Sequence, residues 1–281
     1  MPMVQDDIRR HYEQSWEEKD RVAASVEGLR YSSPVEDAVL YPAYQQLIGD
    51  LKLITDDTRI LDVGSGSGRW VQFFMDHYRP KKLMGVDFAA AAVRLLNRWY
   101  PSTPHTELKF DVCDITRPEL DLCERFDLIN VANVLFHIPE NDRYARAVQN
   151  LASHLAPGGR IVTTEYLPRN SMRTEWMLVR SRYEFEQIIS QAGLKIVQTR
   201  AFCFFSNDPM GLDGTDAGAR GHFGRVRAMT QQLLQSAHDA QTRQYLVNML
   251  AEIERACLAF SRERIAEVDL PSQKLVVLGA K

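Results

Sequence analysis

The feature that most constrains the fold is the stretch at residues 59–70, which reads RILDVGSGSGRW. Its first half is an apolar run that suits a strand covered on both faces, as in a parallel sheet. Glycines at positions 64, 66 and 68 then remove the Cβ atoms that would keep a ligand away from the backbone. A helical pattern follows, and the amide groups at its start suit a carboxylate, hydroxyl or phosphate. The stretch therefore predicts a strand, a glycine turn and a helix, with a small-molecule site at the turn.

The spacing of these glycines narrows the choice of ligand. The dinucleotide fingerprint is G-x-G-x-x-G, whereas this turn reads G-x-G-x-G. The spacing argues against NAD and leaves a glycine turn without a ligand as the alternative. The stretch resembles the first motif of class I S-adenosylmethionine-dependent methyltransferases, and the resemblance can be followed from about residue 58 to residue 200. It implies S-adenosylmethionine as the cofactor, held at this motif by Asp62, Gly64, Ser65, Gly66 and Gly68.

Charge and cysteine usage exclude several classes of function. A net charge of −3 and a pI near 6.2 give no basic surface for nucleic acid, so we expect no nucleic-acid partner. The four cysteines show no C-x-x-C spacing and no histidines at zinc-ligand distance, so we expect buried, reduced thiols and no metal. The sequence has neither a signal-peptide pattern nor a run of 18 apolar residues. We therefore expect a cytoplasmic protein without a membrane partner.

The N-terminal 50 residues are expected to form a helical cap. Residues 4–20 place Ile8, Tyr12 and Trp16 on one face of an amphipathic helix. The two aromatic residues are either core anchors or, as the family resemblance implies, residues that close over the cofactor. A second helix begins at Pro34 and runs to about residue 53. In the loop between the two helices, Tyr31 either reaches the substrate or is exposed.

A second cofactor residue is predicted where the next strand ends. Residues 83–87 form a buried-strand pattern that ends on Asp87, which stands 23 residues after Gly64. A doubly wound fold places a ribose-binding carboxylate at about this distance. The alternative is that Asp87 caps the helix predicted over residues 89–99. We favour ribose binding, with Phe88 flanking the adenine.

The following strands bring further candidates to the same edge of the sheet. The strand at residues 108–112 leads to Asp114 and Ile115, which match the family's adenine-binding positions. Asp111 is the alternative acid for the adenine amino group, although it suits a strand end better. Residues 126–131 form the fourth strand, on which Asn130 is a further cofactor candidate.

The segment after the fourth strand resembles the part of the family that forms the floor of the methyl-transfer site. It contains Asn133, a candidate substrate ligand, and His137, the first candidate for a general base. Open α/β sheets bind ligands at this edge, and histidine suits base catalysis near neutral pH. The alternative is a structural histidine beside the cofactor. Glu165 and His222 are second substrate-side candidates, which otherwise face solvent at a strand end and in a loop, respectively.

The rest of the chain completes one α/β domain with an insertion. The next predicted elements are a helix that begins at Pro139 and runs to Leu155, a Pro-Gly-Gly turn and a fifth strand to about residue 166. They are followed by a helix at 185–192 and a long strand at 194–205. A glycine-rich loop from residue 206 then leads to two helical patterns, which we interpret as a lid over residues 206–269. The cofactor domain is predicted to comprise residues 51–205 and 270–281. The resemblance implies a Rossmann-like doubly wound sheet of seven strands whose last strand, at residues 272–279, is antiparallel.

These features together predict transfer of a methyl group from S-adenosylmethionine to an O or N atom of a small-molecule acceptor, in specialised metabolism. Such a displacement requires alignment and exclusion of water more than it requires catalytic side chains. Two alternatives remain open: another transferase that uses the same cofactor fold, and a catalytically silent cofactor-binding protein that acts through partners. The helical insertion serves either to cover the pocket or to form a homodimer.

Overall fold

One seven-stranded sheet forms the centre of the molecule. The computed structural model describes residues 4–22, 34–120, 122–207, 210, 217–270 and 272–281. The strand order is β3-β2-β1-β4-β5-β9-β8, in which β9 runs antiparallel to both of its neighbours, β5 and β8, and the other neighbouring strands are parallel. The predicted Rossmann-like sheet with an antiparallel last strand is therefore confirmed. The strands are β1 (Arg59–Val63), β2 (Lys82–Asp87), β3 (Glu107–Val112), β4 (Phe126–Val131), β5 (Leu155–Glu165), β8 (Leu194–Ala201) and β9 (Lys274–Ala280).

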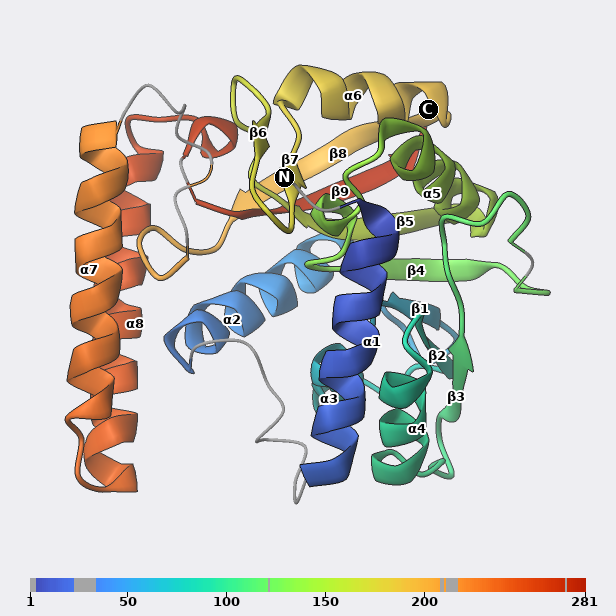
Figure 1. The fold of residues 1–281 in the computed structure, drawn as a ribbon, viewed down its shortest axis with the longest axis horizontal. Helices are drawn as coiled ribbons and strands as arrows, with labels where there is room; N and C mark the ends of the chain where they lie inside the picture. The colour runs from blue at the N-terminus through green and yellow to red at the C-terminus, as the bar shows by residue number, and fades with distance from the viewer. Residues whose placement is uncertain (1–3, 23–33, 121, 208–209, 211–216, 271) are drawn as a thin grey trace.

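Helices cover both faces of the sheet because the strand residues alternate between two apolar cores. On β1, Ile60 packs into the core beneath α2 (Pro34–Leu51), α3 (Arg69–His77) and α4 (Ala90–Trp99). Its neighbour Leu61 packs into the opposite core, beneath α5 (Asn141–Ser153) and α6 (Arg182–Gln191). Figure 1 shows this arrangement of helices around the sheet. The doubly wound architecture leaves the strand ends as the place for a ligand.

The N-terminal helix α1 (Gln5–Val22) lies across the carboxyl ends of the central strands (Figure 1). Trp16 anchors it in a small apolar cluster with alanines and Leu95 of α4. Polar contacts hold the rest of the helix: the Ala90 backbone N–H donates to Glu13, and Asp20 pairs with two arginines of α4. The predicted apolar face of this helix is thus turned toward the sheet edge.

Two long helices form a hairpin at one end of the molecule, beside α2 (Figure 1). They are α7 (Ala217–Gln235) and α8 (Ala240–Arg262). Leu234, Val247 and Leu250 pack with Val35 of α2 in a separate apolar cluster. A short 3-10 helix, η3 (Glu267–Asp269), joins the hairpin to β9. None of the helices in the described part of the chain combines the length and apolar character needed to cross a bilayer.

Four sequence-based expectations about these elements were wrong. Leu155 begins β5 instead of ending α5, and the Pro-Gly-Gly segment belongs to this strand, opposite an irregularity in β4. The strand expected at 194–205 ends at Ala201, and the backbone N–H groups of residues 204–206 donate to the carboxylate of Glu254 on α8 instead of to a neighbouring strand. Helix α7 begins inside the expected glycine-rich loop. Of the four cysteines, only Cys203 is fully buried.

Two small elements after β4 and β5 had no signal in the sequence. A 3-10 turn, η2 (Leu135–His137), carries the predicted histidine. A two-stranded ribbon of β6 (Met172–Arg173) and β7 (Leu178–Val179) contacts η2. Of the two elements, η2 borders the cavity described next, through His137.

Candidate cofactor and active site

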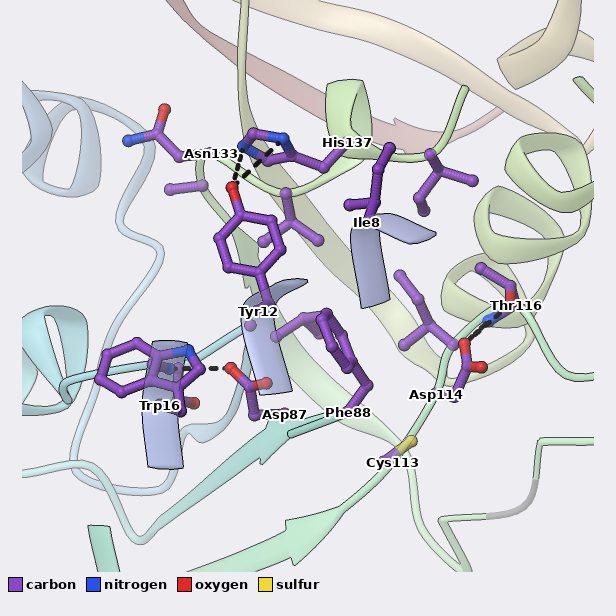
Figure 2. Close-up of a pocket in the computed structure, with 18 of the residues that line it drawn as sticks. Ile8, Tyr12, Trp16, Asp87, Phe88, Cys113, Asp114, Thr116, Asn133 and His137 are labelled. Atoms are coloured by element: carbon purple, nitrogen blue, oxygen red, sulfur yellow. Dashed lines mark hydrogen bonds between the residues drawn. The ribbon is translucent and has the colours of Figure 1, made fainter. Parts of the chain in front are cut away.

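A cavity of about 370 Å³ lies at the carboxyl ends of β1, β2, β3 and β4, beneath α1. Its volume falls within the range of small-molecule sites, roughly 300–1,000 Å³. Figure 2 shows side chains of α1 facing the strand ends across this cavity. The structure brings most of the predicted site residues to its walls, namely Tyr12, Trp16, Gly64, Ser65, Gly66, Asp87, Phe88, Asp114, Ile115, Asn133 and His137.

The glycine turn after β1 is held so tightly that side chains would not fit. Gly64, Gly66 and Gly68 have φ angles of 68°, 50° and 79°, in the left-handed region. A Cβ atom on Gly64 would lie 2.4 Å from a methyl carbon of Val134, which follows β4. A Cβ atom on Gly68 would lie 2.3 Å from the ring of Tyr100. Gly64 therefore shapes the cavity, whereas Gly68, at the start of α3, serves the packing behind it.

Asp87 braces this turn from the end of β2. One carboxylate oxygen accepts the backbone N–H of Gly66 at 3.0 Å, and the other accepts that of Ala89 at 2.9 Å. Burial raises the pKa of Asp87 to about 6, although these hydrogen bonds oppose the shift. The N-cap residue of α4 is Ala89, and no side chain caps this helix, so the capping interpretation of Asp87 was wrong. The carboxylate faces the cavity, as ribose binding requires.

A buried polar chain lies beneath the turn and outside the cavity lining. Asn130 donates to Oδ1 of Asp62 at 2.7 Å and accepts from the Tyr44 hydroxyl at 2.8 Å. The second oxygen of Asp62 has no hydrogen-bond partner among the described residues. Burial raises the pKa of Asp62 to about 7. Asp62 and Asn130 are therefore placed to support the turn. Tyr44 completes this set of buried hydrogen bonds, and no sequence pattern identified it.

The structure separates the two acids that competed for the adenine position. Asp114 lines the cavity, and one of its oxygens accepts from the backbone N–H of Thr116 at 2.9 Å. Its other oxygen pairs with Arg9 of α1 at 3.1 Å. Asp111 instead pairs with Lys109 on β3 at 2.6 Å, outside the cavity lining. Only Asp114 is therefore in a position to contact a ligand in this cavity.

His137 and Tyr12 meet across the cavity (Figure 2). The Tyr12 hydroxyl lies 3.3 Å from Nε2 of His137, and their rings meet edge to face. Nδ1 of His137 lies 3.2 Å from the backbone oxygen of Trp176, in the β6–β7 turn. Burial lowers the pKa of His137 to about 4, so the imidazole is neutral at pH 7.

Asn133 is held in a left-handed conformation, with a φ angle of 60°. Its side-chain oxygen accepts from the Thr164 hydroxyl at 2.9 Å and from Gln273 at 2.7 Å. Gln273, at the entry to β9, also accepts from Asn207 at 3.1 Å. These partners lie far from Asn133 in the sequence, and the sequence analysis missed them. The network fixes the orientation of the Asn133 amide at the cavity wall.

The other substrate-side candidates lie away from this cavity. Glu165 is buried on β5, where it accepts from Thr163 at 3.1 Å, so the alternative interpretation, that it faces solvent, was wrong. Burial raises its pKa to about 7. His222 is exposed on α7, 2.7 Å from Arg225, instead of lying in a loop. Tyr31 lies outside the described residues.

An arginine that the sequence analysis did not single out also lines the cavity. Arg69 follows the glycine turn directly and pairs with Asp37 and with Glu36 of α2, the latter at 3.8 Å. It also donates to the Tyr41 hydroxyl at 3.3 Å. Its position next to Gly68 is the signal that would have identified it.

Comparisons with known proteins agree with this geometry. Residues 60–159 match a family model described as a methyltransferase domain, whereas no curated protein matches the chain. A S-adenosylmethionine-dependent methyltransferase from Leishmania major is 17% identical, with a TM-score of 0.55 over 68% of this chain and 75% of that one. The [4+2]-cyclase SpnF is 15% identical, with a TM-score of 0.52 over 84% of this chain and 80% of that one.

Residues 60–159 thus match a methyltransferase domain, and the order of the seven strands is that of the Rossmann-like methyltransferase fold. S-adenosylmethionine is the cofactor that this resemblance implies. The residues present fit this molecule: two carboxylates, Asp87 and Asp114, stand at the ends of neighbouring strands, and the apolar side chains of Phe88 and of Ile8 on α1 line the same cavity (Figure 2).

Proposed function

We propose that this enzyme methylates an O or N atom of a small-molecule acceptor, a specialised metabolite, inside the cavity beneath α1. The observation that carries the proposal is that a single cavity joins the cofactor candidates to Tyr12, Asn133 and His137. Because α1 covers this cavity, a compact acceptor fits it better than a polymer. Most of the lining is apolar, which favours an acceptor with an apolar body and few polar groups.

In this proposal, each group of cofactor residues contacts a different part of the cofactor or supports the glycine turn. Asp87 accepts the ribose hydroxyls, while Phe88, Asp114 and Ile115 hold the adenine. The backbone of Gly64, Ser65 and Gly66 approaches the methionine end, and Asp62, Asn130 and Gly68 support the turn from behind. When bound, the cofactor supplies an electrophilic methyl group: the acceptor atom bonds to the methyl carbon while the carbon–sulfur bond breaks and leaves its electron pair on sulfur. The role of the chain is to align the acceptor and exclude water.

His137 acts as the general base in this proposal. It lines the cavity, and its lowered pKa keeps the imidazole unprotonated at neutral pH, when a base is needed. Asn133 contacts the acceptor, since its amide is the oriented polar group beside His137. A movement of the chain would have to bring Tyr31, Glu165 or His222 to the cavity before it could contact the substrate.

Calorimetry tests the cofactor part of this proposal, and a transfer assay tests the acceptor part. We expect micromolar binding of S-adenosylhomocysteine and none of NAD. Methyl-labelled S-adenosylmethionine should then label members of a panel of small phenols and amines. Replacement of His137 by Gln should slow transfer to hydroxyl acceptors, whereas replacement of the exposed His105 by Gln should not. Failure to bind S-adenosylhomocysteine would contradict the proposal as a whole.

The fold alone leaves other activities possible, because a [4+2]-cyclase shares it. Another transferase activity with the same cofactor, or a silent cofactor-binding protein, would bind S-adenosylhomocysteine equally well. The labelled methyl group separates these cases: it moves to the acceptor in a methyltransferase and stays on the cofactor in a silent protein.

The same proposal assigns a role to each part of the chain. Residues 1–50 act as a cap, residues 51–205 and 270–281 bind the cofactor, and residues 206–269 act as a lid or as a homodimer contact. The described residues of α7 and α8 contribute nothing to the cavity lining, which favours the dimer contact over the lid. We place the enzyme in the cytoplasm.

A further inference from the structure

The side-chain amide of Asn133 has a defined polarity at the cavity wall. The backbone N–H of Asn133 donates to the Thr164 hydroxyl oxygen at 2.8 Å, and this hydroxyl in turn donates to Oδ1 of Asn133 at 2.9 Å. Nε2 of Gln273 donates to the same Oδ1 at 2.7 Å. Two hydrogen bonds thus use both lone pairs of the amide oxygen. The amide nitrogen, which carries two N–H groups, has no partner among the described residues.

The hydrogen bonds of Gln273 determine which end of its amide faces Asn133. Oε1 of Gln273 accepts from Nδ2 of Asn207 at 3.1 Å, and Oδ1 of Asn207 accepts from the Tyr166 hydroxyl at 2.6 Å. A reversed Gln273 amide would set nitrogen against nitrogen and oxygen against oxygen, and both of its hydrogen bonds would be lost. Gln273 and Thr164 are each 1% exposed and lie behind the cavity lining. They hold Oδ1 of Asn133 on the protein side, and Nδ2 is left for a molecule in the cavity.

The charges around the cavity indicate which kind of oxygen can accept from this nitrogen. The lining contains the carboxylates of Asp87 and Asp114. Arg69, the arginine among the described lining residues, is held by Asp37 and Glu36. A carboxylate on the bound molecule would therefore meet like charges without a cation to pair with. The uncharged carbonyl oxygen of a ketone or an amide accepts a hydrogen bond without this repulsion.

We propose that Asn133 determines specificity by donating a hydrogen bond from Nδ2 to an uncharged carbonyl oxygen of the methyl acceptor. Gln273 and Thr164 are positioning residues, because they act through Asn133 and orient its amide. The acceptor is then an apolar compound that carries a ketone or amide oxygen in addition to the hydroxyl or amine that is methylated. The inference rests on the proposed function and adds a chemical class of acceptor to it.

Calorimetry on the enzyme saturated with S-adenosylhomocysteine tests this preference with a matched pair of probes. 3-Hydroxyacetophenone and 3-ethylphenol share a ring and a hydroxyl group and differ in the carbonyl oxygen, which in the meta position forms no internal hydrogen bond. We expect the ketone to bind about tenfold more tightly, the effect of one net hydrogen bond. The charged 3-hydroxybenzoate should bind no better than 3-ethylphenol. Equal affinity for the first two probes, binding of neither, or tightest binding of the benzoate would overturn the inference.

Variants at two positions test the role of the amide. Asn133→Asp keeps the oxygen that accepts from Thr164 and Gln273 and replaces Nδ2 by a second oxygen, so it should abolish the preference for the ketone. Gln273→Glu should do the same from behind the cavity lining, because Asn133 must then turn its nitrogen toward the new carboxylate. Gln273→Met removes the donor without adding a buried charge, so it serves if Gln273→Glu does not fold. Asn248→Asp, at an exposed asparagine on α8, is the matched control and should keep the preference.

The affinity for S-adenosylhomocysteine separates this inference from the proposed function. In each of these variants it should change less than about threefold. A loss of this affinity in Asn133→Asp would show that the amide serves the cofactor, and a kept preference for the ketone in Asn133→Asp or in the Gln273 variants would equally overturn the inference. Failure of the unmodified enzyme to bind S-adenosylhomocysteine, or to transfer its methyl group to any acceptor, would instead contradict the proposed function.

Discussion

Sequence patterns predict where side chains lie at the carboxyl-terminal edge of the sheet, but they do not do so in the α7–α8 hairpin. At the sheet edge, Asp87 and Asp114 stand at the cavity where their motif positions predict them. In the hairpin, both predicted helices form, but the apolar residues of their predicted patterns face solvent. Met229 on α7 is 67% exposed, and Tyr245 on α8 is 68% exposed. The side chains that pack against α2, such as Leu250, belong to the other face.

This difference follows from what each pattern encodes. A glycine turn with an acid at a fixed distance specifies a local geometry, and that geometry admits few ligands. Apolar residues at helical spacing specify only a helix with an apolar face, and they do not identify the surface that covers it. The hairpin has two apolar faces, and among the described residues α2 packs against one of them. The exposed face is where a second copy would bind if the enzyme is a homodimer.

The largest expected effect distinguishes the two faces of α8 at adjacent positions. Leu250→Ala should lower the free energy of unfolding by about 2–5 kcal/mol, because it leaves a cavity beside Val35 and Val247. Met249→Ala, at a side chain 37% exposed, should cost less than about 1 kcal/mol. Urea unfolding of both variants measures this contrast. Equal losses would mean that something covers both faces.

The next effect concerns a buried acid at the end of β5. Burial raises the pKa of Glu165 from 4.5 to about 7. A carboxyl with a raised pKa in the folded chain stabilises most at low pH, and its contribution is lost as the pH rises from about 4.5 to 7. The 2.5-unit shift corresponds to roughly 3 kcal/mol.

Glu165→Gln removes this titration and should keep the hydrogen bond from Thr163. The variant should therefore gain stability over the unmodified chain above pH 7, by up to roughly 3 kcal/mol, and the gain should shrink toward pH 4. Unfolding measured at several pH values tests this, with Asp111→Asn at an exposed acid as control. A gain that does not vary with pH would show that folding does not shift the pKa of Glu165.

A smaller effect tests the cofactor edge directly. Asp87→Ala should weaken S-adenosylhomocysteine binding by about 10- to 100-fold, since hydrogen bonds to a charged group contribute roughly 1.5–3 kcal/mol. It also releases the Gly66 backbone N–H from its present partner. Asp111→Ala, at the acid that pairs with Lys109, should bind S-adenosylhomocysteine normally. Calorimetry decides between them, and normal binding by Asp87→Ala would restrict this residue to supporting the glycine turn.

The sheet and the cofactor candidates at the strand ends could be predicted because they depend on short, local sequence patterns. Ile60 and Leu61 follow the strand period, and Gly64 and Gly66 adopt the backbone conformations that only glycine tolerates easily. Each of these residues is specified within a few positions of its neighbours. The same reasoning placed Asp87, which is fixed by the length of one βα unit.

Other contacts in the site had no local signal. Trp176 acts through a backbone oxygen, which every residue possesses, so no side-chain pattern identifies it. Gln273 orients Asn133 from 140 residues away. Glu254, on a helix predicted to belong to a separate insertion, accepts backbone N–H groups of the segment after β8. These contacts depend on how distant elements pack, and that packing is decided by the whole core.

The smallest expected effect tests whether the exposed face of the hairpin is covered in solution. Met229→Gln replaces an exposed apolar side chain on α7 with a polar one of similar length, so in a monomer it should change the free energy of unfolding by less than about 0.5 kcal/mol. In a homodimer that uses this face, the variant would lose apolar contacts and dissociate at a higher protein concentration. Sedimentation of both proteins over a concentration series measures this directly. A variant that matches the unmodified chain at every concentration would show that no second copy covers Met229, and that the difference between the two regions lies within one molecule.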